Sequence, residues 1–80
     1  NAICPGSVEG KRMNSVLKME SSATGLTEEE IERQYINSVS LKKFVTAKDV
    51  ADMAVFLASD SASKITGQAL AVDGHTEKMV

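Results

Sequence analysis

The chain has 80 residues, of which 42% are hydrophobic and 25% are charged, and its formal net charge is -2. This balance excludes a disordered segment, and the scattered basic residues argue against nucleic acid as a partner. No apolar run approaches the roughly 20 residues of a membrane span, so we expect no membrane partner either. A chain of this size buries only about 60% of its unfolded surface, so we expect a thin margin of stability.

The single cysteine, Cys4, leaves no room for an intrachain disulfide framework. We interpret it as a small core hydrophobe, because it lies in an apolar run before Pro5. Cysteine usage of this kind is typical of a reducing compartment, and the N-terminus has no signal peptide, so we expect a cytoplasmic protein. The opening Asn-Ala-Ile-Cys has the character of the inside of a strand, which indicates a fragment of a longer polypeptide.

The first expected element is the end of a buried strand, from Asn1 to Cys4. Pro5 has no amide hydrogen and should stop the hydrogen-bond ladder, and Gly6 permits a turn into a loop over residues 7–10. Ligands of open α/β sheets bind beside the carboxyl ends of the strands. The sequence therefore predicts that this loop lies at a binding edge.

A short helix is predicted from Lys11 to Glu20, followed by a connector over residues 21–25. Its apolar residues recur at helical spacing and form one stripe, made of Met13, Val16 and Leu17. This stripe indicates a helix that packs on a partner and leaves its basic residues in solvent.

A second helix is predicted from Glu28 to Val39, because Thr27 and Glu30 have the spacing of a capping box. The inward face consists of Ile31, Tyr35 and Val39. We interpret the acidic residues 28–30 as a solvated cap and not a metal site, since three consecutive residues point in different directions around a helix.

A third helix is predicted from Ala47 to Ala58, with Thr46 as its N-cap and Asp49 reaching back to it. Its apolar face is wider than one neighbour needs and consists of Val50, Met53, Ala54, Phe56 and Leu57. We expect two partners, a sheet on one side and another helix or subunit on the other. After a break at residues 59–61 and a turn at residues 66–67, a strand is predicted from Ala69 to Val72.

The order strand, helix, helix, helix, strand predicts two parallel strands joined through helices in a right-handed crossover. The fold class is therefore α/β. Because a parallel sheet needs both faces covered, two strands alone cannot complete it. We interpret the chain as the C-terminal segment of a doubly wound parallel sheet in a larger domain.

Several segments resemble the short-chain dehydrogenases/reductases. Residues 1–8 are similar to the Asn-Ala-(Ile/Val)-x-Pro-Gly-x-Val segment of that family, and residues 44–51 are similar to the start of its last long helix. Its C-terminal signature is matched by residues 56–60, 65–68 and 72–74, in the same order and at similar spacing. The likeness covers nearly the whole chain, with residues 11–41 matching only in type.

The resemblance implies a Rossmann domain that binds NAD or NADP and transfers hydride between nicotinamide and an alcohol or carbonyl substrate. The family's glycine-rich loop and its catalytic Ser, Tyr and Lys lie upstream of the Pro-Gly segment, so no catalytic residue is expected in this chain. Tyr35 has no Lys four residues later and is interpreted as structural. The missing N-terminal part of the domain and a small-molecule substrate are the implied partners.

The resemblance also assigns three regions. Residues 1–10 would be a strand end and cofactor loop, in which Pro5, Gly6, Ser7 and Val8 lie beside the nicotinamide. The family often has Thr at the position of Gly10, so that side-chain contact is absent here. Residues 11–41 would be substrate-loop helices, where Met13, Val16 and Leu17 either line a pocket or pack on the domain. Residues 46–74 would be the last long helix and last strand.

The last helix and strand resemble the parts by which the family pairs subunits, so we expect a homo-oligomer, a dimer or a tetramer. The candidate interface residues are Val50, Met53, Phe56, Leu57, Ala69, Leu70, Ala71 and Val72. His75 is interpreted as a surface or interface residue, with no metal expected. The alternative is a truncated, non-enzymatic helical module that binds a partner through residues 50, 53, 54, 56 and 57.

Overall fold

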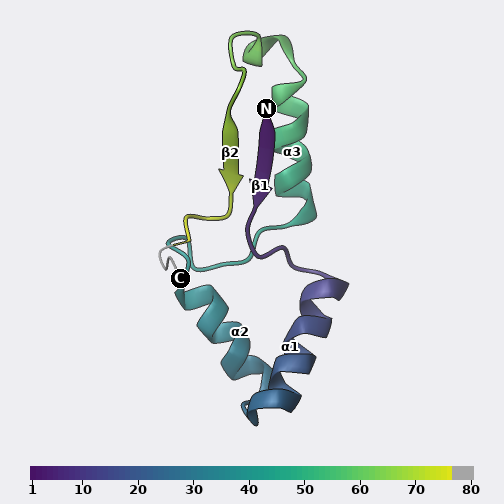
Figure 1. Ribbon diagram of the computed structural model, residues 1–80, viewed down its shortest axis with the longest axis vertical. Helices are drawn as coiled ribbons and strands as arrows, with labels where there is room; N and C mark the ends of the chain where they lie inside the picture. Colours follow the sequence, from purple (N-terminus) through teal and green to yellow (C-terminus); the bar gives the residue numbers. More distant parts are fainter. Residues whose placement is uncertain (77–80) are drawn as a thin grey trace.

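The computed structural model describes residues 1–76. Its elements are β1 (Ala2–Pro5), α1 (Lys11–Thr24), α2 (Glu28–Asn37), α3 (Ala47–Leu57), a short 3-10 helix η1 (Asp60–Ala62) and β2 (Ala69–Val72). Figure 1 shows two parts, a sheet with α3 beside it and an α1–α2 hairpin that projects from the carboxyl ends of the strands.

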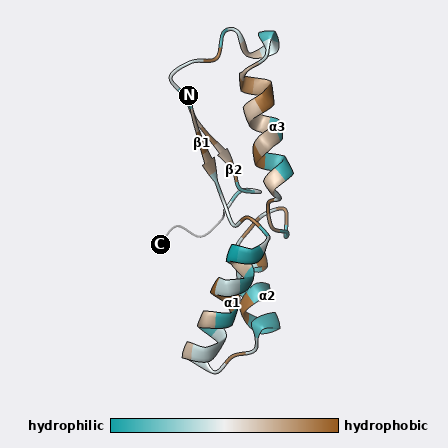
Figure 2. Cartoon of the chain, turned by 90° about the vertical axis from the view of Figure 1, so that its right-hand side faces the viewer, coloured by the Kyte–Doolittle hydropathy of each residue, from teal (hydrophilic) through white to brown (hydrophobic). Residues whose placement is uncertain are grey.

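β1 and β2 are parallel neighbours, with Ala2 opposite Ala69 and Pro5 opposite Val72. Figure 2 shows α3 running along one face of both strands. The predicted α/β class, the parallel pairing through intervening helices and the bounds of β2 are confirmed. Within residues 1–76, no helix is long and apolar enough to cross a membrane.

The ladder ends at Pro5, as predicted, but the missing amide hydrogen is not the cause. The amides of Ala2 and Gly6 donate to the carbonyls of Gln68 and Val72, at 2.8 Å and 3.0 Å. Amides alternate in direction along a strand, so the nitrogen of Pro5 lies on the edge away from β2. The missing hydrogen therefore removes no bond between the two strands.

The expected connector over residues 21–25 is also wrong in part, since α1 continues to Thr24. The helix ends at Gly25, which has a left-handed φ of 79° and donates its amide to the carbonyl of Ser21. A glycine in this conformation satisfies the open carbonyls of a last turn. The small polar residues before it are helical, because nothing in them breaks a helix before that glycine.

α2 begins as predicted, where the side chain of Thr27 accepts the amide of Glu30. It ends at Asn37, two residues before the predicted end, and Val39 instead forms an antiparallel bridge with Thr76. Val39 and Ile31 are buried, as the inward face requires.

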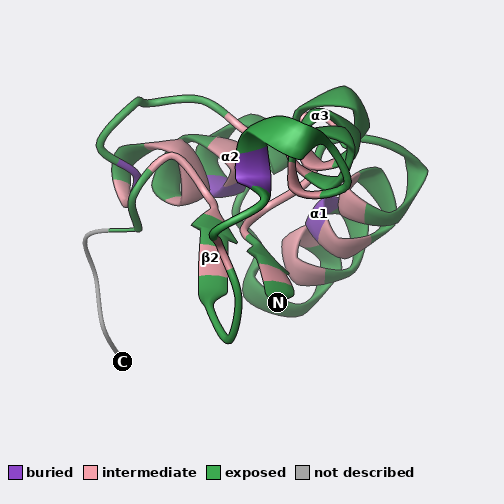
Figure 3. Ribbon diagram, turned by 90° about the horizontal axis from the view of Figure 1, so that it is seen from above, coloured by how far each residue is buried: buried purple, intermediate pink, exposed green. Residues whose placement is uncertain are grey.

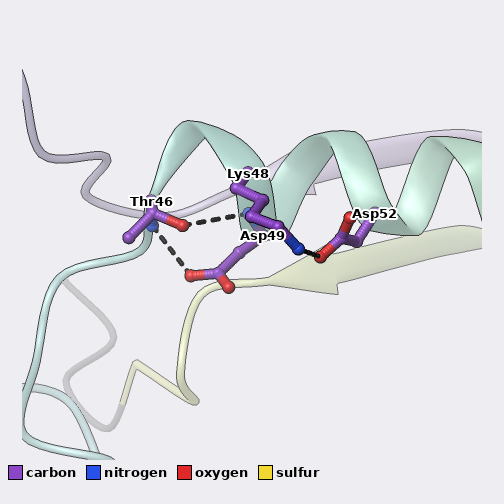
Figure 4. Close-up of polar contacts among 4 residues, drawn as sticks. All are labelled: Thr46, Lys48, Asp49 and Asp52. Carbon is purple, nitrogen blue, oxygen red and sulfur yellow. Dashed lines mark hydrogen bonds and ion pairs between the residues drawn. The ribbon is translucent and has the colours of Figure 1, made fainter.

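α3 begins with a complete capping box (Figure 4). The hydroxyl of Thr46 accepts the amide of Asp49 at 3.0 Å, and the Asp49 carboxylate accepts the amide of Thr46 at 2.8 Å. These bonds hold the pKa of Asp49 below its ordinary value, the backbone bond from Thr46 being the larger cause. Lys48 and Asp52 form an exposed ion pair one turn on, and the Asp52 carboxylate raises the pKa of Lys48.

Few side chains are buried (Figure 3). The buried hydrophobic residues are Leu17, Ile31, Val39, Val45 and Ala62. The interpretation of Cys4 as a core residue is wrong for this chain, since Cys4 is exposed. Burial alternates along β2, where Leu70 and Val72 are half-buried and Ala69 and Ala71 are exposed. One face of the sheet is therefore covered by α3, and the small residues of the other face are open.

Candidate functional site

A hollow of about 550 Å³ lies at the carboxyl end of β1, between the loop that follows the strand and the first turns of α1. It is lined by Pro5, Gly6, Val8, Glu9, Gly10, Lys11, Arg12, Met13 and Val16. Two sets of residues predicted separately, the cofactor loop and the apolar stripe of α1, thus share one hollow.

Gly6 holds the loop against the turn that follows β2. A Cβ atom at this position would lie 2.6 Å from the Cβ and 2.8 Å from the Cα of Asp73. The Gly6 amide also donates to the carbonyl of Val72. The two chain segments therefore approach at a distance that only glycine allows.

The backbone of Val8 is oriented by its neighbours. The Ser7 carbonyl accepts the amide of Val45 at 2.9 Å, and the Glu9 amide donates to the carbonyl of Val45 at 2.8 Å. Successive residues of an extended segment direct their polar groups to opposite sides, so the amide and carbonyl of Val8 point away from Val45. Val8 is also one of the residues that line the hollow, and its amide and carbonyl take no part in the pairing with Val45.

On the α1 side the hollow is lined by two half-buried apolar residues, Met13 and Val16, and at the first turn by the exposed Lys11 and Arg12. Leu17, which is 6% exposed, is buried in the hairpin and is not among the residues lining this hollow. Of the three predicted pocket residues, the structure thus brings Met13 and Val16 to the loop.

Tyr35 fastens α2 to α1 by donating its hydroxyl to Oε1 of Glu20 at 2.7 Å. This hydrogen bond, followed by burial and by the charge of Glu20, raises the pKa of Tyr35. Its ring also contacts that of Phe44, with centroids 6.5 Å apart. These contacts agree with the structural role that the sequence predicts for this tyrosine.

The predicted interface residues divide into two groups. Those facing the covered side of the sheet are half-buried: Val50, Met53, Leu57, Leu70 and Val72. Those that remain exposed are Phe56, Ala69 and Ala71. Val55, which the sequence did not single out, is 69% exposed, against 42% for Phe56.

A second hollow, of about 800 Å³, lies between the α2–α3 connection and the end of β2. His75 is exposed as predicted, lines this hollow and places Nδ1 2.6 Å from the hydroxyl of Ser40. Within residues 1–76, no three His, Cys, Asp or Glu side chains gather in a way that could hold a metal ion.

Three residues that shape the site escaped the sequence analysis. Val45 pairs with the loop after β1, and Asp73 packs on Gly6. The Asn1 side chain accepts the Gln68 amide at 2.9 Å and so ties the start of β1 to the start of β2. The Asp-Gly pair after β2 was a signal for the turn. No local pattern in the sequence indicated that Asp73 packs on Gly6.

Known proteins match this chain over most of its length. The family model for enoyl-(acyl carrier protein) reductase matches residues 1–75. The D-beta-hydroxybutyrate dehydrogenase of Rhizobium meliloti is 38% identical over 79 residues, which cover 92% of this chain and 29% of that protein. The putative ketoacyl reductase of the monensin polyketide synthase of Streptomyces virginiae is 39% identical over 74 residues, covering 92% and 28%.

Solved structures of reductases also match this chain. Actinorhodin polyketide ketoreductase with NADPH matches with a TM-score of 0.82 at 32% identity, over 99% of this chain and 30% of that one. YwfH, an NADPH-dependent reductase involved in bacilysin biosynthesis, matches with a TM-score of 0.80 at 28% identity, over 98% and 29%.

The chain belongs to the short-chain dehydrogenase/reductase family of oxidoreductases, and its strands and helices are part of a Rossmann-type fold. It spans about three tenths of the length of the curated relatives that it matches.

Proposed function

We propose that this chain is the C-terminal part of an NAD(P)-dependent oxidoreductase that transfers hydride between nicotinamide and an alcohol or carbonyl substrate. Residues 5–8 flank the nicotinamide, and the backbone of Val8 hydrogen-bonds its carboxamide. Met13 and Val16 form the substrate side of the same hollow. The chain supplies binding surfaces, while the reacting groups come from the part of the domain that precedes it.

One observation carries this proposal. Residues of the loop after β1 and of the apolar stripe of α1 line one hollow, and the amide and carbonyl of Val8, a lining residue, are not used in the pairing with Val45. A carboxamide has one carbonyl and one NH₂ group, so it complements one backbone donor and one backbone acceptor. An apolar wall with a few placed polar groups is typical of a small-molecule site.

NADPH is the first cofactor to test, because two similar structures have names that include it. The chain would not select it over NADH, since the ribose-reading residue of such domains follows the first strands of the fold. Cofactor preference is therefore a property of the complete domain.

The test uses a matched pair of variants in the full-length protein. Val8→Pro removes the amide of residue 8 but keeps both hydrogen bonds to Val45, which use the Ser7 carbonyl and the Glu9 amide. Val8→Ala keeps the amide and shortens the side chain. We expect calorimetric titration with NADPH to give a roughly tenfold weaker affinity for Val8→Pro only, as for one lost hydrogen bond. Equal affinities in the two variants would overturn the role of Val8.

We also propose that the exposed side of α3 and the outer edge of β2 pair subunits. Val55 and Phe56 are exposed on α3, and β2 has a strand on one side only within the described sheet. Open edges and exposed apolar side chains favour association. The expected assembly is symmetric.

Sedimentation of two charge variants tests this pairing. Val55→Glu should dissociate the assembly, whereas Met19→Glu should leave it intact. Met19 is a fair control because it is 72% exposed on α1, against 69% for Val55 on α3. An unchanged sedimentation coefficient for Val55→Glu would exclude this face as the interface.

A further inference from the structure

The α1–α2 hairpin is joined to the sheet and α3 through two connections. α1 and α2 contact each other, and among the helices and strands of residues 1–76 neither contacts β1, β2 or α3. Figure 1 shows the hairpin projecting from the sheet on its two connections, residues 6–10 and 38–46. Within this chain, the angle of the hairpin depends on how these two connections are held.

Both connections are held by backbone pairing. The first is joined to the second where Val8 bridges Val45. The second is also held by the segment that follows β2, since the Ser40 amide donates to the His75 carbonyl at 2.8 Å and the Leu41 amide to the Gly74 carbonyl at 3.1 Å. The segment after β2 thus contacts the connection that follows α2, far from it in sequence.

The closest approach in this pairing is between Gly74 and Val39. A Cβ atom on Gly74 would lie 2.8 Å from Cγ1 of Val39. Val39 is 4% exposed, and its β-branched side chain has little rotational freedom, so it cannot turn away. Gly74, which has a φ of 67°, therefore packs directly on the connection that follows α2.

We propose that residues 73–76 act as a clamp that sets the angle of the α1–α2 hairpin, and with it the width of the hollow between the cofactor loop and α1. Gly74 and Val39 are positioning residues in this clamp. The meaning of the hollow rests on the proposed function, but the clamp itself is a property of the fold and can be measured without ligand.

Amide hydrogen exchange of the full-length protein without cofactor tests the clamp. Gly74→Ala adds the colliding atom, and Gly67→Ala is its control, because Gly67 has nearly the same φ, 68°, with no atom within 4 Å of the added Cβ. Only Gly74→Ala should speed exchange of the Leu41 amide, by roughly tenfold, or about 1.4 kcal/mol. The amides of Val45 and Glu9, which hold the other connection, should speed up with it.

A rescue variant separates a clamp from general destabilisation. Val39→Ala removes the atom with which Ala at position 74 collides, so the double variant should exchange more slowly at Val45 than Gly74→Ala alone. This non-additivity measures the coupling between the two positions. If Gly74→Ala does not fold, Gly74→Asn replaces it, because Asn tolerates a positive φ and still places a Cβ beside Val39.

Spin labels on Ser22 in α1 and Lys64 beyond α3, both exposed, report the hairpin angle directly. We expect a broader distance distribution in Gly74→Ala and an unchanged one in Gly67→Ala. Equal effects in the two glycine variants, additivity of the changes at positions 39 and 74, or faster exchange confined to Leu41 would each overturn the clamp. If the amides of both connections exchanged faster in Gly74→Ala but the protein bound no dinucleotide, only the proposed function would be overturned.

Discussion

Replacing Gly6 with alanine tests the close approach between the loop after β1 and Asp73 in the turn after β2. The added Cβ would lie 2.6 Å from the Cβ of Asp73, below the distance that real contacts reach, and its next neighbour is the Asp73 Cα at 2.8 Å. Since a backbone atom cannot swing aside, the loop or the turn after β2 must move. Such overpacking costs about 1–3 kcal/mol.

The movement also lengthens the bond from the Gly6 amide to the Val72 carbonyl, now 3.0 Å. A lost hydrogen bond of this kind costs about 0.5–1.5 kcal/mol. We therefore expect Gly6→Ala to lower the free energy of unfolding by about 2–4 kcal/mol in denaturant titrations. It should also weaken NADPH binding, because the loop beside the hollow is displaced.

The control is Gly25→Ala in the turn after α1. Gly25 has a φ of 79° and no atom within 4 Å of an added Cβ, so it tests backbone strain without collision. We expect it to cost about 1 kcal/mol and to leave NADPH affinity unchanged. If Gly6→Ala were no less stable than Gly25→Ala and bound NADPH normally, the reasoning about Asp73 would be refuted.

Three further predictions concern the caps and the hairpin. Thr46→Ala should cost about 1 kcal/mol of stability by removing the α3 capping box, whereas Thr66→Ala should stay within about 0.5 kcal/mol in the same denaturant titration. The folded pKa of Asp49 lies below its ordinary 3.8, so its contribution is present above the unfolded pKa and is lost as the pH falls through the folded one. Acidification below that range should reduce helicity measured by circular dichroism, and Asp49→Asn should flatten this dependence. The folded pKa of Tyr35 lies above 10.0, so its contribution is present below the unfolded pKa and is lost as the pH rises through the folded one. Absorbance titration, taken as a difference from Tyr35→Phe, should show ionisation at a lower pH in Glu20→Gln.

Local signals in the sequence predicted the helix starts and the last strand correctly. Thr27 and Thr46 each bond an amide three residues later, so the cap is visible within four residues of sequence. The last strand is likewise marked locally, by the turn at residues 66–67 before it and the Asp-Gly pair after it. Such features depend on neighbours in the chain and can be inferred without knowing the fold.

The features that the sequence did not reveal depend on distant contacts. Val8 pairs with Val45, and Val39 pairs with Thr76, through isolated backbone bridges that leave no periodic pattern. The apolar run around Cys4 suggested a core residue, but whether Cys4 is buried depends on what covers the other face of the sheet. The end of α1 was misplaced for a different reason, since its last residues are equally compatible with a helix and a loop.

In the proposed function, the backbone of Val8 holds the nicotinamide end of the cofactor. Nuclear magnetic resonance of the full-length, ¹⁵N-labelled protein tests it with two ligands, NADPH and adenosine 2′,5′-bisphosphate, which lacks the nicotinamide. We predict that saturation with NADPH moves the Val8 amide resonance downfield, as a new hydrogen bond requires, and that the bisphosphate leaves it in place. If the Val8 amide resonance does not shift when the protein is saturated with NADPH, or shifts equally with both ligands, Val8 does not hold the nicotinamide end.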